Sequence, residues 1–267
     1  RLSWRYEGYA ALETDRMAAG LYGIYAPTGF TPSLQWDVYG KRPNAWRLSL
    51  DELESVNYHA DNPVAVDYLL VANSMGLGGP TIGSGRPVAI TNGDYTYRVL
   101  CNGPVRAGLE VRVTDWGTPA GGLYDATIGY VVYAGHDFID ATFALTEREA
   151  SDEDFGLGVR RIPHVEAFVG DEEAGVLGVM GRQDGIVAKT GLAVLFEPQR
   201  FLRWGVEDEP TDAYMIYLSP DAEGGAEVYR ARLLGIWSEG GVANEHTMPR
   251  HLLDLAARMN EPVEVSR

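Results

Sequence analysis

A carboxylate, a phenol and two cations lie within six positions in the segment Asp37-Val-Tyr-Gly-Lys-Arg42. Successive side chains of a β-strand point to opposite faces, so Asp37, Tyr39 and Lys41 would share one face of a strand. Such a row could bind hydroxyl and carboxylate groups, and Tyr39 or Lys41 could act as acid or base if its pKa were lowered. The alternative is an edge strand whose exposed polar residues carry no function.

Two histidines extend this set of candidate catalytic residues. His59 lies in an irregular, turn-rich stretch just before the glycine-rich segment 73–85, and it is the leading candidate for a single site residue. His164 follows Arg160 and Arg161 near the end of a predicted strand. Such a positive cluster could clamp a carboxylate, because a guanidinium binds it through two parallel hydrogen bonds.

Two further arginines are candidates for binding an anionic substrate. Arg98 and Arg106 lie on adjacent predicted strands that are joined through the turn Asn102-Gly103. If the two side chains share a face, they form a cationic spot on an acidic protein. The alternative is ordinary cross-strand pairing with a nearby acid such as Glu110.

Aromatic residues and one more histidine complete the candidate binding residues. Exposed aromatic rings beside acids and amides hold sugar rings by stacking. Trp36 and Trp237 are candidates for this role, although most aromatic residues are expected in the core. His246 precedes a predicted terminal helix, where it would suit either a helix cap or a cleft.

Antiparallel strands must position these residues. Residues 104–116 alternate strictly between apolar and polar or glycine positions, which is the pattern of a half-buried strand. An apolar face of this length needs a second sheet to cover it. Closely spaced strands separated by turn signals such as Asn92-Gly93 are typical of a sandwich or barrel. We predict strands at 17–25, 34–39, 66–72, 87–91, 94–101, 104–116, 122–133, 137–147, 156–162, 165–169, 175–180, 186–197, 212–219 and 226–237.

One helix is predicted, at about residues 248–260, with Thr247 as its cap and Pro249 in its first turn. Five glycines within residues 73–85 predict a loop there, and residues 51–54 could form a single helical turn. No linker or internal repeat divides the chain. The expected architecture is therefore all-β, one large antiparallel sandwich over residues 1–267 with a short C-terminal helix.

The composition excludes some classes of partner. The net charge of −16 leaves no basic stripe for nucleic acid, and no apolar run approaches the roughly 18 residues of a membrane span. No metal or nucleotide motif is present, so no cofactor is expected, although a divalent metal such as calcium is not excluded. The single cysteine, Cys101, cannot form an intramolecular disulfide and leaves the redox compartment open.

Several separate segments resemble the bacterial DUF4861 family of uncharacterised proteins, and the similarity covers nearly the whole chain. The resemblance implies a galactose mutarotase-like sandwich, a role in degrading uronate-containing polysaccharides, and a periplasmic or secreted location. It assigns no catalytic residues. This chain reads Tyr39 where members tend to have phenylalanine, and its glycine-rich loop is altered at Ser74–Gly79, but no titratable group is lost. The segments that carry the similarity are 13–22, 36–41, 58–59, 67–79 and 97–106.

These observations favour a protein that acts on an acidic oligo- or polysaccharide, with β-elimination by a polysaccharide lyase as the leading hypothesis. A basic residue such as Arg106, or Arg161 with His164, would neutralise the sugar carboxylate. His59, Tyr39 or Lys41 would serve as base and acid. The alternatives are a mutarotase-like or hydrolytic enzyme on glycan fragments and a non-catalytic glycan-binding module.

Overall fold

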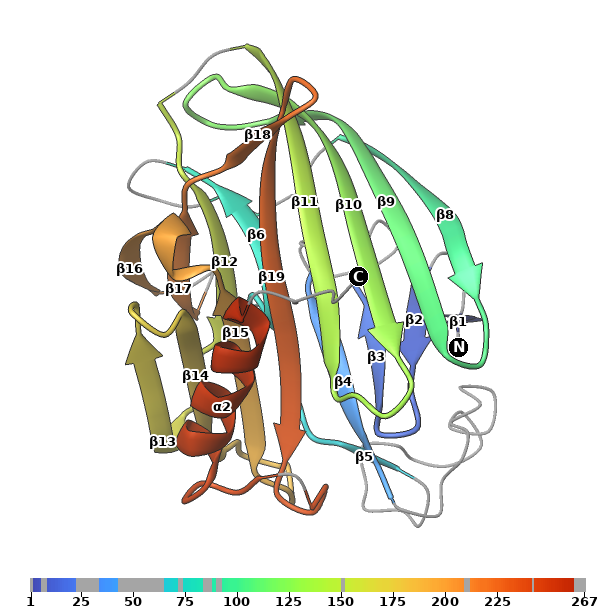
Figure 1. Cartoon of the computed structure of the whole chain (residues 1–267), viewed down its shortest axis with the longest axis vertical. Coiled ribbons are helices and arrows are strands. Elements are labelled where there is room, and N and C mark those ends of the chain that lie inside the picture. Colours follow the sequence, from blue (N-terminus) through green and yellow to red (C-terminus); the bar gives the residue numbers. More distant parts are fainter. Residues whose placement is uncertain are drawn as a thin grey trace, which may run out of the picture.

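The described residues form two large antiparallel sheets packed face to face, with helix α2 (Met248–Asn260) on the outside, as the computed structural model shows (Figure 1). The predicted all-β sandwich with a terminal helix is confirmed. No helix among the described residues is long and apolar enough to cross a membrane. The structure describes residues 2–5, 9–22, 34–42, 65–71, 74–83, 88–89, 93–149, 152–208, 212–241 and 243–261.

The first sheet, called sheet A, carries Asp37, Tyr39 and Lys41. Its strand order is β1-β2-β3-β4-β6-β12-β17-β16, with β5 beside β4 and β7 beside β6. The strands are β1 (Leu2–Arg5), β2 (Tyr9–Glu13), β3 (Met17–Leu21), β4 (Trp36–Lys41), β5 (Ala65–Asp67), β6 (Leu77–Ile82), β7 (Val88–Ala89), β12 (Phe155–Arg160), β16 (Phe201–Glu207) and β17 (Ala213–Leu218).

The second sheet, called sheet B, contains the longest strands and covers the inner face of sheet A. Its order is β13-β14-β15-β19-β11-β10-β9-β8, with β18 beside β19. The strands are β8 (Asp94–Asn102), β9 (Arg106–Gly117), β10 (Leu123–Tyr133), β11 (Phe138–Glu149), β13 (His164–Asp171), β14 (Val176–Arg182), β15 (Thr190–Phe196), β18 (Asp221–Glu223) and β19 (Ala226–Trp237); a 3-10 turn, η1 (Pro198–Arg200), precedes β16.

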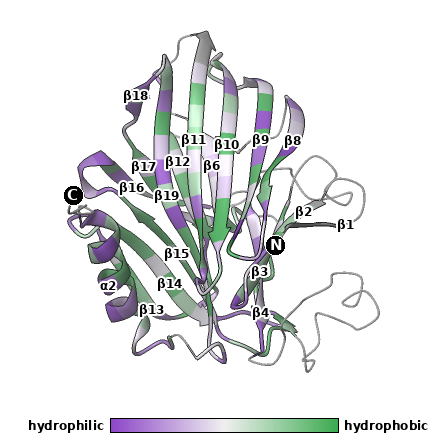
Figure 2. Cartoon of the chain, turned by 45° about the vertical axis from the view of Figure 1, so that its right-hand side comes forward, coloured by the Kyte–Doolittle hydropathy of each residue, from purple (hydrophilic) through white to green (hydrophobic). Residues whose placement is uncertain are grey.

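The alternation of side chains along the strands forms the core between the sheets. On β9 the apolar residues Ala107, Leu109, Val111 and Val113 are buried, as the pattern of residues 104–116 predicted. Figure 2 shows the matching alternation of polar and apolar residues along β9, β10 and β11. Each apolar face excludes water against the other sheet, which is the main stabilising contribution to such a sandwich.

The prediction of a loop over residues 73–85 was wrong, because β6 lies in this segment and in the middle of sheet A. The glycines of β6 allow close packing and do not make the segment a loop. A Cβ at Gly78 would lie 2.4 Å from Leu233 Cδ1 on β19, and one at Gly79 would lie 2.6 Å from Met75 Cε. The side chains of Leu233 and Met75 therefore fill the space beside the β6 backbone, which only glycine at these positions leaves open.

Besides β6, four strands were not predicted, and one predicted strand is much shorter than expected. The unpredicted strands are β1, β2, β16 and β18; β5 covers only Ala65–Asp67 of the predicted 66–72. The predicted helical turn at 51–54 lies outside the described residues. Strands β1, β2 and β18 have only 4, 5 and 3 residues, so alternation has too few positions to stand out, whereas β16 has 7 residues and was missed despite its length.

Helix α2 (Met248–Asn260) has the predicted bounds and packs on the outer face of sheet B. Its buried residues Met248, Leu252 and Ala256 join an apolar cluster from β14 and β15. The predicted cap was wrong in its chemistry, since the side chain of Thr247 makes no capping hydrogen bond. Asn244 Oδ1 instead accepts the N–H groups of His246 and Thr247, which begins the turn into the helix.

Candidate functional site

The outer face of sheet A carries a row of buried polar side chains from β4. Trp36 and Val38 point into the core between the sheets, so Asp37, Tyr39 and Lys41 point to the outer face, as predicted. The alternative of a solvated edge strand does not hold, since β4 lies between β3 and β6 and all three polar residues are buried. We call Gln35, Asp37, Tyr39 and Lys41 the outer-face row.

Asp37 is the centre of this row. The hydroxyls of Tyr39 and Tyr22 donate to its Oδ2 at 2.8 Å and 3.3 Å. Its Oδ1 is buried and has no hydrogen-bond partner in the described part of the chain. Burial, and then the nearby carboxylate of Asp67, raise the pKa of Asp37 well above its usual range. A proton on neutral Asp37 would therefore sit on Oδ1, where it could be donated to a ligand.

Tyr39 donates to Asp37, whereas Lys41 binds Glu13, and the role of Lys41 as acid or base stays a prediction. Burial, and then the carboxylates of Asp37 and Asp67, raise the pKa of Tyr39, so the lowered pKa required of it as a base is absent. Lys41 Nζ donates to Glu13 Oε1 at 2.9 Å and to the carbonyl of Thr14 at 2.7 Å. Its ammonium thus ties β4 to the β2–β3 hairpin.

Arg160 faces the outer-face row from β12. Trp36 and Val159 both align with Leu77 of β6, which places β4 and β12 on either side of that strand. Two strand spacings separate them, roughly 10 Å. Val159 points into the core, so Arg160 points outward, and its N–H donates to the carbonyl of Gly76.

Gln35 and Arg160 share a feature with Asp37: buried polar atoms that lack a partner. Gln35 Oε1, Arg160 Nε and Arg160 Nη1 have no hydrogen bond within the described ranges of the chain. Only 9% of Arg160 is exposed, and this burial lowers the pKa of its guanidinium while Asp212 opposes the shift. Because native proteins pair nearly all buried polar groups, these three residues make the outer face of sheet A the candidate place for a polar ligand.

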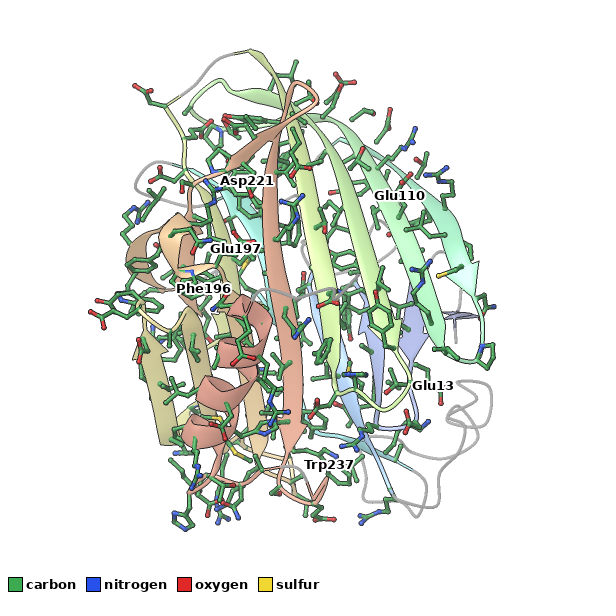
Figure 3. All side chains as sticks on the ribbon, in the orientation of Figure 1. Glu13, Glu110, Phe196, Glu197, Asp221 and Trp237 are labelled. Atoms are coloured by element: carbon green, nitrogen blue, oxygen red, sulfur yellow. The ribbon has the colours of Figure 1, made fainter. Side chains whose placement is uncertain are left out.

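The predicted arginines on sheet B do not contribute to this site. Arg98 and Arg106 lie on the outer face of sheet B, which is the opposite side of the sandwich. Arg98 pairs with Glu110 at 2.7 Å, as the alternative interpretation predicted, and Arg112 pairs with the same carboxylate. Figure 3 labels Glu110 on β9 of sheet B and Glu13, which belongs to β2 of sheet A.

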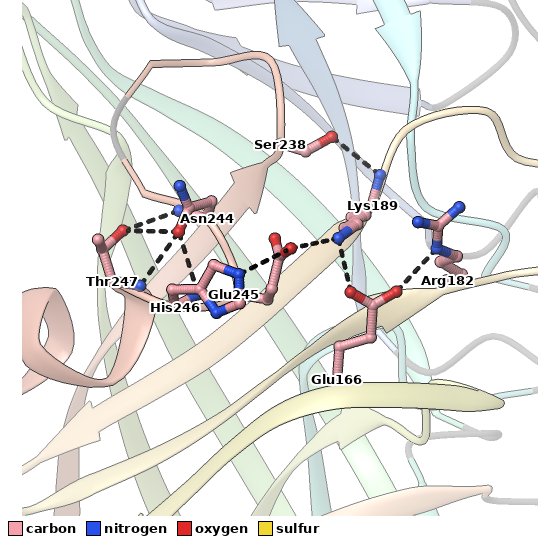
Figure 4. Close-up of polar contacts among 8 residues, drawn as sticks. All are labelled: Glu166, Arg182, Lys189, Ser238, Asn244, Glu245, His246 and Thr247. Carbon is pink, nitrogen blue, oxygen red and sulfur yellow. Dashed lines mark hydrogen bonds and ion pairs between the residues drawn. The ribbon is translucent and has the colours of Figure 1, made fainter.

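Arg161, His164 and His246 each lie beside an acidic side chain of the protein. Arg161 pairs with Asp208 at 2.7 Å, and His164, 61% exposed, lies 3.3 Å from Asp184. His246 is 84% exposed and contacts Glu245 in a surface network with Lys189 (Figure 4). The clamp by Arg161 with His164 stays a prediction.

The remaining predicted residues divide between core, pocket and undescribed chain. Trp36 is completely buried, with its ring edge-on to Tyr130 at 4.9 Å, so its proposed contact with a sugar was wrong. Trp237 is buried but lines a pocket at the base of the sandwich together with Tyr39 and Lys41. His59 lies outside the described residues.

Sequence reasoning missed Gln35, Tyr22 and Asp67 as members of the site. Gln35 could have been predicted, since the alternation that places Asp37 on the outer face also places the residue two positions before it there. Asp67 lies opposite Tyr39 across the β4–β5 pair, and this pairing has no local signal. Within the described ranges, no group of three or more His, Cys, Asp and Glu residues could hold a metal ion.

Comparison with known proteins gives a family and a distant structural likeness. The family model described as Domain of unknown function (DUF4861) matches residues 2–265. No curated protein matches the chain. A solved structure, the GalM/aldose epimerase homologue from C. elegans, is 9% identical with a TM-score of 0.35, and the similarity covers 86% of this chain and 98% of that one.

Proposed function

This chain belongs to the DUF4861 family, and from that premise we propose that it acts on an acidic carbohydrate at the outer face of sheet A. The observation that carries the proposal is the set of buried, unpartnered polar atoms on Gln35, Asp37 and Arg160. Leaving a buried donor or acceptor unpaired costs about 1–3 kcal/mol. A bound polyol with a carboxylate would supply partners for all three residues.

Arg160 supports an acidic rather than a neutral sugar. Its guanidinium is the cation that faces the row without a carboxylate partner at Nε and Nη1 in the described part of the chain. These two nitrogens with Nη2 form the fork that binds a carboxylate through two hydrogen bonds. A uronate carboxylate bound there is neutralised, and the proton on the adjacent C5 becomes more acidic.

Asp37 is the group that moves a proton in this proposal. Because its pKa is raised, a fraction of Asp37 stays protonated at pH values where an exposed aspartate is ionised. The proton on Oδ1 would pass to the oxygen that leaves C4 in β-elimination, while a base removes the C5 proton. His59 remains the predicted base.

Hydrolysis or epimerisation is the second candidate, favoured by the pair Asp37 and Asp67. The nearby charge of Asp67 contributes to the raised pKa of Asp37, so the two carboxyl groups are poised for different protonation states. One protonated acid and one carboxylate are the arrangement that acid–base catalysis at a sugar carbon uses.

Incubation with pectate, alginate, ulvan and glucuronan tests the leading candidate. Elimination produces a C4–C5 double bond, read as new ultraviolet absorbance. Release of reducing ends without that absorbance supports hydrolysis, and faster equilibration of anomers supports epimerisation. Binding without turnover of any substrate would support a non-catalytic glycan-binding module. The absence of both binding and turnover would refute the proposal.

Arg160→Gln tests the role of the guanidinium. Loss of a charge-assisted hydrogen bond of about 1.5–3 kcal/mol predicts a rise in KM of about 10- to 100-fold. The variant should fold as well as the wild type, because Nε and Nη1 have no hydrogen-bond partner among the described residues. Arg182→Gln is the matched control, since that side chain is 63% exposed and pairs with Glu166. Equal KM values for the two variants would contradict the assignment.

A further inference from the structure

A pocket opens at the base of the sandwich, between β4, β19 and the turn that joins β10 to β11. Its cavity volume is about 170 Å³, and its walls include Arg16, Tyr39, Lys41, Asp137 and Trp237. Figure 3 marks Trp237 at this end of the molecule. The volume resembles that of an engineered cavity of about 150 Å³ that accepts a benzene ring. A six-membered ring is therefore the right size of occupant.

Two buried polar atoms in this pocket lack partners. Tyr68 Oη and Asp137 Oδ2 make no hydrogen bond within the part of the chain that the structure describes. Tyr68 is only 1% exposed, and both residues line the pocket. One is a hydroxyl that donates or accepts, and the other is an acceptor, so they match the hydroxyl groups of a polyol.

The other walls are apolar and aromatic. Met17 and Ile236 contribute aliphatic surface, and Trp237 contributes an indole whose ring plane lies within 10° of that of Tyr68, at 6.3 Å. Gly40 makes room for this indole, since a Cβ there would lie 2.4 Å from the ring. An aromatic wall with a few polar groups is typical of sites that bind sugar rings.

The charged walls of the pocket balance, with Arg16 and Lys41 against Asp15 and Asp137, so the pocket offers no excess positive charge for an acidic ring. The ammonium of Lys41 is already paired with Glu13 at 2.9 Å. Asp15 Oδ1 accepts the N–H of Gly135 at 2.6 Å, and Asp137 adds a second carboxyl group to the wall. A carboxylate on the ligand would face Asp137 at short range, whereas a hydroxyl would donate to it.

We propose that this pocket binds a neutral sugar ring, next to the acidic sugar unit held at the outer-face row. The two sites meet at Tyr39, which lines the pocket and donates its hydroxyl to Asp37. This inference rests on the proposed function and adds a substrate class to it: an oligosaccharide in which an uncharged unit adjoins a uronate.

Tyr68→Phe tests the pocket with D-galactose as the probe, followed by saturation-transfer NMR and isothermal titration calorimetry. The variant removes only the unpartnered hydroxyl. We expect galactose affinity to fall about five- to tenfold while the unfolding midpoint is no lower than in the wild type. Asp137→Asn, which keeps the shape of the side chain, should weaken binding in the same direction.

Tyr229→Phe is the matched control, because it makes the same chemical change elsewhere on the molecule. Tyr229 Oη donates to Glu227 Oε2 at 3.0 Å near the start of β19, whereas the pocket lies at the end of that strand. This variant should lower the unfolding midpoint and leave galactose affinity unchanged. The two substitutions therefore have opposite expected effects on stability and binding.

The outcomes separate this inference from the proposed function. Galactose binding that survives Arg160→Gln but not Tyr68→Phe supports the pocket. Galactose binding that is unchanged in Tyr68→Phe, or absent from folded wild-type protein, overturns the pocket. The proposed function is judged separately by binding and turnover of the uronate polymers.

Discussion

Asp37 gives the clearest prediction at the scale of a residue. Its folded-state pKa is raised, so the folded protein binds a proton that the unfolded chain releases at the ordinary aspartate pKa of about 3.9. The stability from that proton is fully present below the unfolded pKa and is lost as pH rises through the folded pKa. Asp37→Asn should remove this loss and raise the free energy of unfolding at neutral pH by about 1 kcal/mol or more, because a buried amide carries no charge to desolvate.

Denaturant melts of wild type and Asp37→Asn across this pH window measure the effect. Glu110→Gln is a control of opposite sign, because hydrogen bonds from Arg98 and then Arg112 hold the pKa of Glu110 below its usual range. Its stabilising contribution is present above the unfolded pKa and is lost as pH falls through the folded value. Parallel pH profiles for wild type and Asp37→Asn would contradict the assignment.

The ion pair of Lys41 and Glu13 fixes the position of the outer-face row within sheet A. Both partners are buried, with side-chain exposures of 0% and 6%. Breaking a buried pair costs about 3–5 kcal/mol, because the remaining charge stays desolvated. Lys41→Met should therefore destabilise strongly, and Glu13→Gln in the same chain should recover part of the loss. Calorimetric melting of the single and double variants checks this coupling, and strictly additive losses would exclude it.

At the scale of the element, β6 shows what glycine does inside a sandwich. Gly78 has a φ of +68°, and a Cβ there would overlap Leu233. Gly78→Ala should lower the free energy of unfolding by about 1–3 kcal/mol through overpacking, with further backbone strain. Gly129→Ala on β10 is the control, because its Cβ would meet nothing within 4 Å. Similar urea midpoints for the two variants would refute the packing role of Gly78.

A comparison of β6 with β9 and α2 shows which elements can be predicted from the sequence. The pattern over 104–116 predicted β9 because one face meets a core and the other meets water, so alternation is complete. Helix α2 was predicted with its bounds because its apolar stripe recurs at the helical period. In strand β6, glycines leave space that the side chains of other residues fill. Its glycine content alone predicts a loop, because the neighbours that fill this space cannot be seen in the local sequence.

At the scale of the whole molecule, charge opposes the proposed ligand. A net charge of −16 repels an acidic oligosaccharide during approach, and salt screens that repulsion over about 8–10 Å. The association rate of a uronate oligosaccharide should therefore rise from low to physiological ionic strength, while that of a neutral oligosaccharide stays constant. Stopped-flow binding measures both, and an association rate that falls with salt would indicate steering by a positive surface instead.

The assembly of the site also belongs to this scale and explains the limits of sequence reasoning. Asp37 and Arg160 lie more than a hundred residues apart in the chain, and β6 joins their strands. Local patterns showed that Asp37 shares a face with Tyr39 and Lys41. They could not show that Arg160, rather than Arg98 or Arg106, faces that row, because strand order is a property of the complete sheet.

The atoms of Gln35, Asp37 and Arg160 that lack hydrogen-bond partners among the described residues predict that the substrate will stabilise the folded protein measurably. A compound that satisfies them binds the folded chain and not the unfolded one, so it raises the melting temperature by mass action. A library of sugar acids and mixed oligosaccharides can therefore be ranked by thermal shift before any reaction is known. The compounds that stabilise the wild type and fail to stabilise Arg160→Gln are those to assay for turnover.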